Sequence, residues 1–137
     1  MTRVLWRTAF ATVLVAAIGV ASAEDVSVKL TGAEETPAVS TSATGEGKIT
    51  IGKDGVVKGS VKTKGITGTA AHIHEAPAGK AGPPVITLMK SGDDTWSVPE
   101  GAKLTEEQYK AFKDGNLYVN VHSAEHKPGE IRGQLKP

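Results

Sequence analysis

Strict alternation of apolar and polar side chains characterises the segment LYVNVH, at residues 117–122. The apolar residues Leu117, Val119 and Val121 share one parity, and the polar residues between them share the other. Successive side chains of an extended strand point to opposite faces of the sheet. The segment is therefore predicted to be a β-strand with one face on an apolar core and the other on the outside.

A second segment, AAHIHE at residues 70–75, places two imidazoles two residues apart. In a strand, Ala71 and Ile73 would face one way, and His72 and His74 would share the other face about 6–7 Å apart. Both rings could then reach one metal ion, since imidazole is a ligand for copper, zinc, iron and nickel. The alternative is a pair of polar residues on a solvated strand face, and this motif alone leaves both interpretations open.

Similar strand-forming segments recur along the chain between turn signals. GKDG at residues 52–55 predicts a tight turn, because Asp-Gly adopts positive φ at low cost. We count about seven strands, at residues 26–30, 44–51, 57–63, 70–75, 85–89, 117–122 and 130–135. This pattern predicts an all-β protein, an antiparallel sandwich or barrel with Greek-key connections.

One short helix is predicted after Leu104. Thr105 and Gln108 have the spacing of a capping box, and Gly115 marks the end of the helix. A helix this short is not stable alone, so Tyr109 and Phe112 are expected to pack on the sheet.

The first 23 residues have the organisation of a secretory signal peptide. Arg3 and Arg7 form a positive start, residues 8–20 are mainly apolar, and ASA at 21–23 is a small-x-small cleavage site. The apolar run is short for a bilayer core of about 30 Å, which disfavours a membrane anchor. We expect one mature domain at residues 24–137, secreted or periplasmic, with no membrane attachment.

The charge balance and the cysteine count restrict the function classes. Lys and Arg total 16 against 15 Asp and Glu, so removal of Arg3 and Arg7 leaves 14 against 15, a net charge of −1 with neutral His. This balance does not suggest a nucleic-acid partner. The chain has no cysteine, so a metal site must use His, carboxylate or backbone ligands. A Gly-x-Ser-x-Gly nucleophile elbow is also absent.

All four histidines of the chain lie in or beside two predicted strands, on the parity opposite to the apolar residues. We expect them on the outside of the sheet, beneath the Gly- and Pro-rich loop at residues 75–84. His72, His74 and His122 are the candidate metal ligands, and three nitrogens at about 2 Å would leave one coordination position open. His126 is a candidate fourth ligand, and the alternative is a solvated loop histidine.

Two charged residues near the histidines have competing interpretations. Glu75 is either a group that orients an imidazole or a surface charge. Arg132, which neighbours Glu130, is either a catalytic cation that guides an anion to the site or part of an exposed ion pair worth at most about 1 kcal/mol.

Six motifs taken together resemble the CHRD (chordin-type) domain family, over essentially the whole mature chain. They are LTGAEETP (30–37), ATG (43–45), TAAHIH (69–74), Gly79 with GPPV (82–85), LYVNVH (117–122) and GEIRGQ (129–134). The family's histidines match His72, His74 and His122. His126 falls where the family pattern does not require histidine.

A looser similarity is to the copper–zinc superoxide dismutases, which are Greek-key β-barrels. His72 and His74 resemble their copper strand, and His122 and Arg132 resemble a later copper ligand and the active-site arginine. The histidines are too few for a separate zinc site, and there is no cysteine pair. The resemblance implies a copper-only variant with a single metal ion. The expected fold is an antiparallel Greek-key sandwich or barrel, superoxide-dismutase-like or immunoglobulin-like, with one short helix.

The expected function is that of an exported copper-binding protein that dismutates superoxide, a small anionic substrate. One alternative is a periplasmic copper carrier or sensor, although only Met89 remains in the mature chain for Cu(I). The other is a non-catalytic extracellular binding or scaffolding module, with a protein partner at residues 96–109.

Overall fold

The computed structural model describes Val13 and residues 22–137, so the predicted signal peptide lies outside the described residues apart from Val13 and its last two positions. Nine antiparallel strands form one sheet, in the order β5-β4-β8-β9-β1-β2-β3-β7-β6. They are β1 (Ala23–Thr31), β2 (Thr44–Gly52), β3 (Val57–Lys64), β4 (Gly68–Glu75), β5 (Pro84–Thr87), β6 (Met89–Gly92), β7 (Thr95–Ser97), β8 (Leu117–Ser123) and β9 (Ile131–Leu135).

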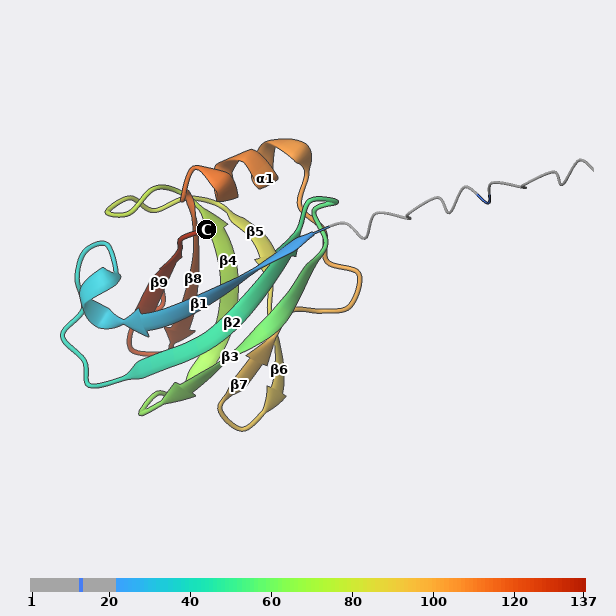
Figure 1. Ribbon diagram of the computed structural model, residues 1–137. Helices are drawn as coiled ribbons and strands as arrows, with labels where there is room; N and C mark the ends of the chain where they lie inside the picture. The colour runs from blue at the N-terminus through green and yellow to red at the C-terminus, as the bar shows by residue number, and fades with distance from the viewer. Residues whose placement is uncertain (1–12, 14–21) are drawn as a thin grey trace, which may run out of the picture.

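This sheet curls into a nearly closed barrel. The two ends of the strand order, β5 and β6, are consecutive in the chain and are joined through Leu88. The Leu88 amide donates to Ala71 O at 2.9 Å, which ties the joint to β4. Figure 1 shows the resulting barrel, with the helix α1 (Glu106–Lys113) across one end. The predicted all-β antiparallel barrel with one short helix is confirmed.

The expected number of strands, about seven, is wrong. Residues 85–89 were expected to form one strand, but they divide into β5 and β6 at Leu88, and β7 forms around Trp96. The physical reason is closure of the barrel. Before Leu88 the chain pairs with β4, at one end of the strand order. After Leu88 it pairs with β7, at the other end.

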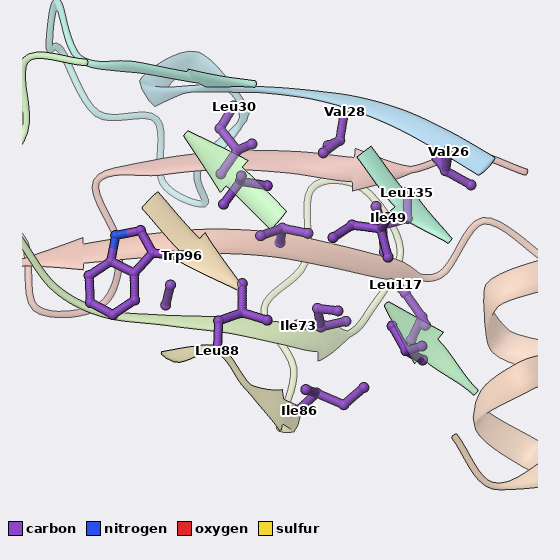
Figure 2. Close-up of a cluster of buried hydrophobic side chains, with 14 of the residues drawn as sticks. Val26, Val28, Leu30, Ile49, Ile73, Ile86, Leu88, Trp96, Leu117 and Leu135 are labelled. Atoms are coloured by element: carbon purple, nitrogen blue, oxygen red, sulfur yellow. The ribbon is translucent and has the colours of Figure 1, made fainter. Parts of the chain in front are cut away.

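The core fills the barrel interior with the apolar parity of each strand. Figure 2 shows side chains of β1, β2, β4 and β8, among them Val28, Ile49, Ile73 and Leu117, pointing toward one another. The fully buried members include Leu30, Ile49, Ile73, Leu117, Val119, Val121, Ile131 and Leu135. The alternation in LYVNVH therefore sets the inward face of β8, as predicted.

The helix closes one end of this core. Thr105 Oγ1 accepts from Gln108 N at 3.1 Å, and Thr105 N donates to Gln108 Oε1 at 2.9 Å, so the predicted capping box is confirmed. Phe112 is fully buried, while Tyr109 is half-buried against the cluster. Gly115 has φ +77°, the left-handed conformation that ends helices.

The described part of the chain contains no helix long and apolar enough to cross a bilayer.

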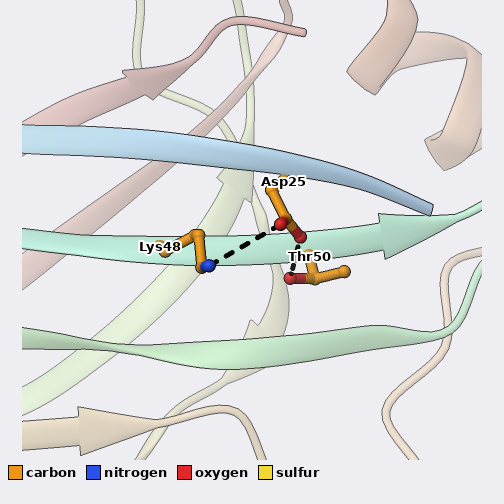
Figure 3. A network of polar contacts seen from close by, with 3 residues as sticks. All are labelled: Asp25, Lys48 and Thr50. Carbon is orange, nitrogen blue, oxygen red and sulfur yellow. Dashed lines mark hydrogen bonds and ion pairs between the residues drawn. The ribbon is translucent and has the colours of Figure 1, made fainter.

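The outside of the barrel differs from one wall to the other. On β1 and β2 it is solvated: Thr50 Oγ1 donates to Asp25 Oδ1 at 2.7 Å, and Lys48 Nζ lies 3.6 Å from Asp25 Oδ2 (Figure 3). The Thr50 hydrogen bond and then the Lys48 charge lower the pKa of Asp25. On β8 the outward residues Tyr118 and Asn120 are buried instead, because loops cover that wall. The covered wall carries the histidines.

Replacing Ile73 with Ala should test the inward parity of β4. The change leaves a cavity in a fully buried position, so we expect the free energy of unfolding to fall by about 2–5 kcal/mol in urea denaturation. Lys58→Ala, on the exposed face of β3, is the control and should change it by no more than about 0.5 kcal/mol. Equal effects of the two substitutions would contradict the assignment of the core face.

Candidate metal centre

Pairing between β4 and β8 brings three histidines together on the covered wall. In this register His74 lies opposite Tyr118, His72 opposite Asn120, and Ala70 opposite His122. The three imidazoles share the outer face, and one nitrogen of each lies within 4.8 Å of the others. Residues 72, 74 and 122 therefore form a candidate metal site, as the sequence predicts.

Two of the ring nitrogens are already at ligand spacing. His72 Nδ1 lies 3.0 Å from His122 Nε2, and their ring centroids are 4.9 Å apart. Two nitrogens each bound at about 2.0–2.1 Å to one ion are about 2.9 Å apart at a right angle and about 3.4 Å apart at a tetrahedral angle. Without a metal, the same contact is a hydrogen bond between the rings.

Backbone carbonyls fix the tautomers of two histidines. His74 Nδ1 donates to Gly82 O at 2.9 Å, and His122 Nδ1 donates to Lys127 O at 2.7 Å. A carbonyl oxygen only accepts, so each Nδ1 carries the hydrogen and each neutral ring has its lone pair on Nε2. This is the arrangement that orients metal-binding histidines. His74 Nε2 is buried without a hydrogen-bond partner, so no protein group uses its lone pair.

Burial favours the neutral form of two of the three histidines. It is the largest cause that lowers the pKa of His72, and the neighbouring His122 and His74 lower it further. Burial also lowers the pKa of His74, against an opposing effect of the Gly82 hydrogen bond. Metal ligands must be unprotonated. The lowered pKa values therefore leave both imidazoles available to a cation at neutral pH.

The loop between β4 and β5 covers the site, as expected. Its Gly82 amide donates to the Tyr118 hydroxyl at 3.2 Å, and its Gly82 carbonyl receives the His74 hydrogen. A side chain at Gly82 would overlap the Glu75 carbonyl, so this close approach requires glycine. The loop thereby supplies an orienting group to His74 and covers its ring.

Arg132 holds the same loop from β9. Its guanidinium donates to Lys80 O at 2.8 Å, to Pro77 O at 3.1 Å and to Gln134 Oε1 at 3.1 Å. It also lies 3.4 Å from the centroid of the Tyr118 ring, which in turn stacks on His74 at 4.9 Å and 4°. Arg132, Tyr118 and His74 thus form one continuous stack that runs into the site.

The alternative that Arg132 forms an exposed ion pair with Glu130 is wrong. Its side chain is only 1% exposed. Glu130 is also buried and accepts from Thr41 Oγ1 at 2.8 Å and from Ser123 Oγ at 2.7 Å instead. The loops that cover this wall exclude water from both residues. Direct contact between Arg132 and a dissolved anion would require exposure that the side chain does not have.

His126 and Glu75 lie outside the cluster of three. His126 is in the turn between β8 and β9, where its amide donates to Ser123 Oγ at 3.1 Å, and it lines a separate hollow beside Glu35. Glu75 ends β4, and its described hydrogen bond is between its backbone amide and Pro83 O. The orienting role proposed for Glu75 is performed by the carbonyls of Gly82 and Lys127, which carry no sequence signal.

The metal-free protein should lose stability as the pH falls from 7 toward 5. Folding lowers the pKa of His72 and His74, so the unfolded chain binds more protons in this window and acid favours unfolding. The contribution of these two histidines to the free energy of unfolding is complete above the ordinary His pKa of about 6.5. It is lost as the pH falls through their lowered pKa values. Urea midpoints of EDTA-treated protein at several pH values would measure it.

The matched comparison is the variant His72→Gln/His74→Gln. This variant should show a weaker dependence of the free energy of unfolding on pH between pH 5 and 7. Glu35, whose pKa burial raises, acts with the opposite sign, but it is present in both proteins and cancels in the comparison. If the free energy of unfolding changed with pH equally in the variant and the wild type, groups other than His72 and His74 would cause the change.

Replacing Arg132 with Lys should loosen the covering loop. Lysine keeps the charge but cannot bond to Pro77 O and Lys80 O as a planar fork. We expect a loss of about 1.5–3 kcal/mol in the free energy of unfolding and faster amide hydrogen exchange at residues 76–83. Lys80→Ala is the control, since only the backbone of Lys80 is used. Unchanged exchange in Arg132→Lys would contradict the anchoring role.

Comparison with known families agrees with the motifs. The model of the CHRD domain matches residues 26–135, from the first core residue of β1 to the last residue of β9, and it includes the three histidines and Arg132. Neither the curated proteins nor the solved structures gave a match. The family match covers well over half of the 137 residues. The chain therefore belongs to the CHRD domain family.

Proposed function

We propose that this protein, after export, binds one copper ion through His72, His74 and His122 and dismutates superoxide. The observation that carries the proposal is the convergence of three imidazoles on an outer wall, with the lone pairs of His74 and His122 set by carbonyl hydrogen bonds. These hydrogen bonds leave the Nε2 lone pair of each of the two rings free for a metal.

The donor chemistry favours copper among the divalent metals. All three donors are imidazoles, which suit copper and zinc, and copper has the highest affinity in the Irving–Williams order. The 3.0 Å spacing of His72 Nδ1 and His122 Nε2 would let both nitrogens reach one ion.

The residues around the histidines suit a small anionic substrate. When bound, copper supplies the one-electron chemistry by which two superoxide ions and two protons become O₂ and H₂O₂. His72 and His122 are half-buried, so the site is reachable from solvent on their side. Arg132 acts on the site through Tyr118 and the loop, and its buried positive charge adds to the local field without contacting the anion.

The same ligands also serve the alternative of a copper carrier or sensor, which binds the ion without turnover. The third function, a scaffolding module, receives less support. Trp96, at the start of the segment predicted to contact a partner, is 6% exposed and belongs to the core. The observation that separates the alternatives is superoxide turnover by the copper-loaded protein.

Copper titration of the metal-free protein should show one Cu(II) per chain. His72→Ala and His122→Ala should abolish tight binding, and His126→Ala is the matched control that should retain it. Copper at 100 times its dissociation constant adds about 2.7 kcal/mol of apparent stability, so thermal melts with copper and with EDTA give an independent readout.

Superoxide consumption by the loaded protein then distinguishes the functions. Turnover that is lost in His122→Ala and retained in His126→Ala supports the dismutase. Binding without turnover would favour the carrier or sensor. No saturable copper binding by the folded wild-type protein would overturn the metal proposal and leave the recognition module.

A further inference from the structure

Asn120 stands at the centre of the three histidines. On β8 it lies directly opposite His72, with His122 two residues further along the same face and Tyr118, the partner of His74, two residues before it. Cross-strand neighbours in such a ladder have Cβ atoms about 4.5–5.5 Å apart. Asn120 is only 2% exposed, so its amide must find its partners within the protein.

The orientation of this amide follows from its hydrogen bonds. Asn120 Nδ2 donates to Pro128 O at 3.3 Å and to Glu35 Oε1 at 3.5 Å, which uses both of its hydrogens. The reverse orientation would set Oδ1 against the same two acceptors. In the observed orientation Asn120 Oδ1 is buried with no hydrogen-bond partner. A buried acceptor left unpaired is destabilising, because it has given up its hydrogen bonds to water.

A second unpaired acceptor lies beside it. His74 Nδ1 is bonded to Gly82 O, so the ring meets other groups through Nε2, which is also buried and unpartnered. His74 pairs with Tyr118, and Asn120 follows two residues later on the same face, so Asn120 is the diagonal neighbour of His74 across the two strands. Diagonal neighbours are about 7–8 Å apart, within reach of longer side chains. Each buried lone pair has lost its hydrogen bonds to water, and a cation bound by both would remove the two desolvation costs together.

We propose that Asn120 Oδ1 is a fourth protein donor to the ion held by the three histidines, an inference that rests on the proposed metal site. Side-chain amide and backbone oxygens act as weak ligands beside two histidines and a cysteine in blue-copper centres, so an amide oxygen is a chemically reasonable additional donor to copper. The fourth donor therefore need not displace an imidazole, and it explains why a buried amide leaves its oxygen unpaired at this place.

Glu35 is the positioning residue for this donor. It is 9% exposed and contacts the Asn120 amide rather than the histidines. Gly129 makes the approach possible, since a side chain there would overlap both Glu35 Oε1 and Asn120 Nδ2. The carboxylate and the Pro128 carbonyl together turn the oxygen of Asn120 toward the site.

The test compares Cu(II) binding to Asn120→Leu and to Asn116→Leu at pH 8, after circular dichroism shows that each variant is folded. Asn116 is outside the site, in the turn after α1. We expect the dissociation constant to rise about 10–100-fold in Asn120→Leu, with changed Cu(II) hyperfine splitting in electron paramagnetic resonance. Asn116→Leu should match the wild type in both.

A double variant keeps the inference testable if Asn120→Leu does not fold. Glu35→Gln/Asn120→Asp exchanges the roles, because the new amide at 35 can donate to the new carboxylate at 120. We expect it to bind copper with a changed Cu(II) spectrum, since a carboxylate oxygen then faces the site in place of the amide oxygen.

The outcomes separate the two proposals. A wild-type protein that does not bind copper overturns the metal site itself. A wild-type protein that binds copper, with the same affinity and spectrum in folded Asn120→Leu, overturns only the role of Asn120. A folded double variant with the same Cu(II) spectrum as the wild type would also overturn it.

Discussion

The antiparallel register between β4 and β8 is the constraint on which both the core and the candidate metal centre depend. It opposes Ile73 with Val119 inside the barrel and His72 with Asn120 outside. A slip of one residue would exchange the faces of a strand, moving its polar side chains into the core and its apolar ones toward the loops. The burial of Ile73 and Val119 therefore also fixes where the imidazoles stand.

The loops that cover the outer wall also supply the hydrogen-bond partners that the covered polar groups need. Polar groups on β4, β8 and β9 lose water when the loops fold over them, and each needs a hydrogen-bond partner. Backbone carbonyls of the covering segments, those of Gly82 and Lys127 among them, supply most of these partners. Of the three buried side-chain atoms left unpaired in the described structure, two are His74 Nε2 and Asn120 Oδ1, both at the candidate site.

The stack of Arg132, Tyr118 and His74 links the loop mechanically to the site. A guanidinium that donates to two loop carbonyls and lies on an aromatic ring has little freedom to move. Tyr118 is in turn held through its hydroxyl by the Gly82 amide, which belongs to the residue that orients His74. His74 is thus positioned from its ring face and from its Nδ1 by connected contacts.

The sequence by itself determined the all-β class, the inward parity of the strands, the capping box of α1 and the set of three histidines, because alternation and spacing are local properties of a strand or a helix turn. It did not reveal the division of residues 85–89 or the burial of Arg132. It also gave no indication of the carbonyls that orient the histidines, since a backbone carbonyl has no residue identity. Those features depend on barrel closure and on which loop lies over which wall. Only the tertiary structure decided them, because Arg132 contacts a loop more than 50 positions before it, and the path of a loop back over its own strand has no local sequence pattern.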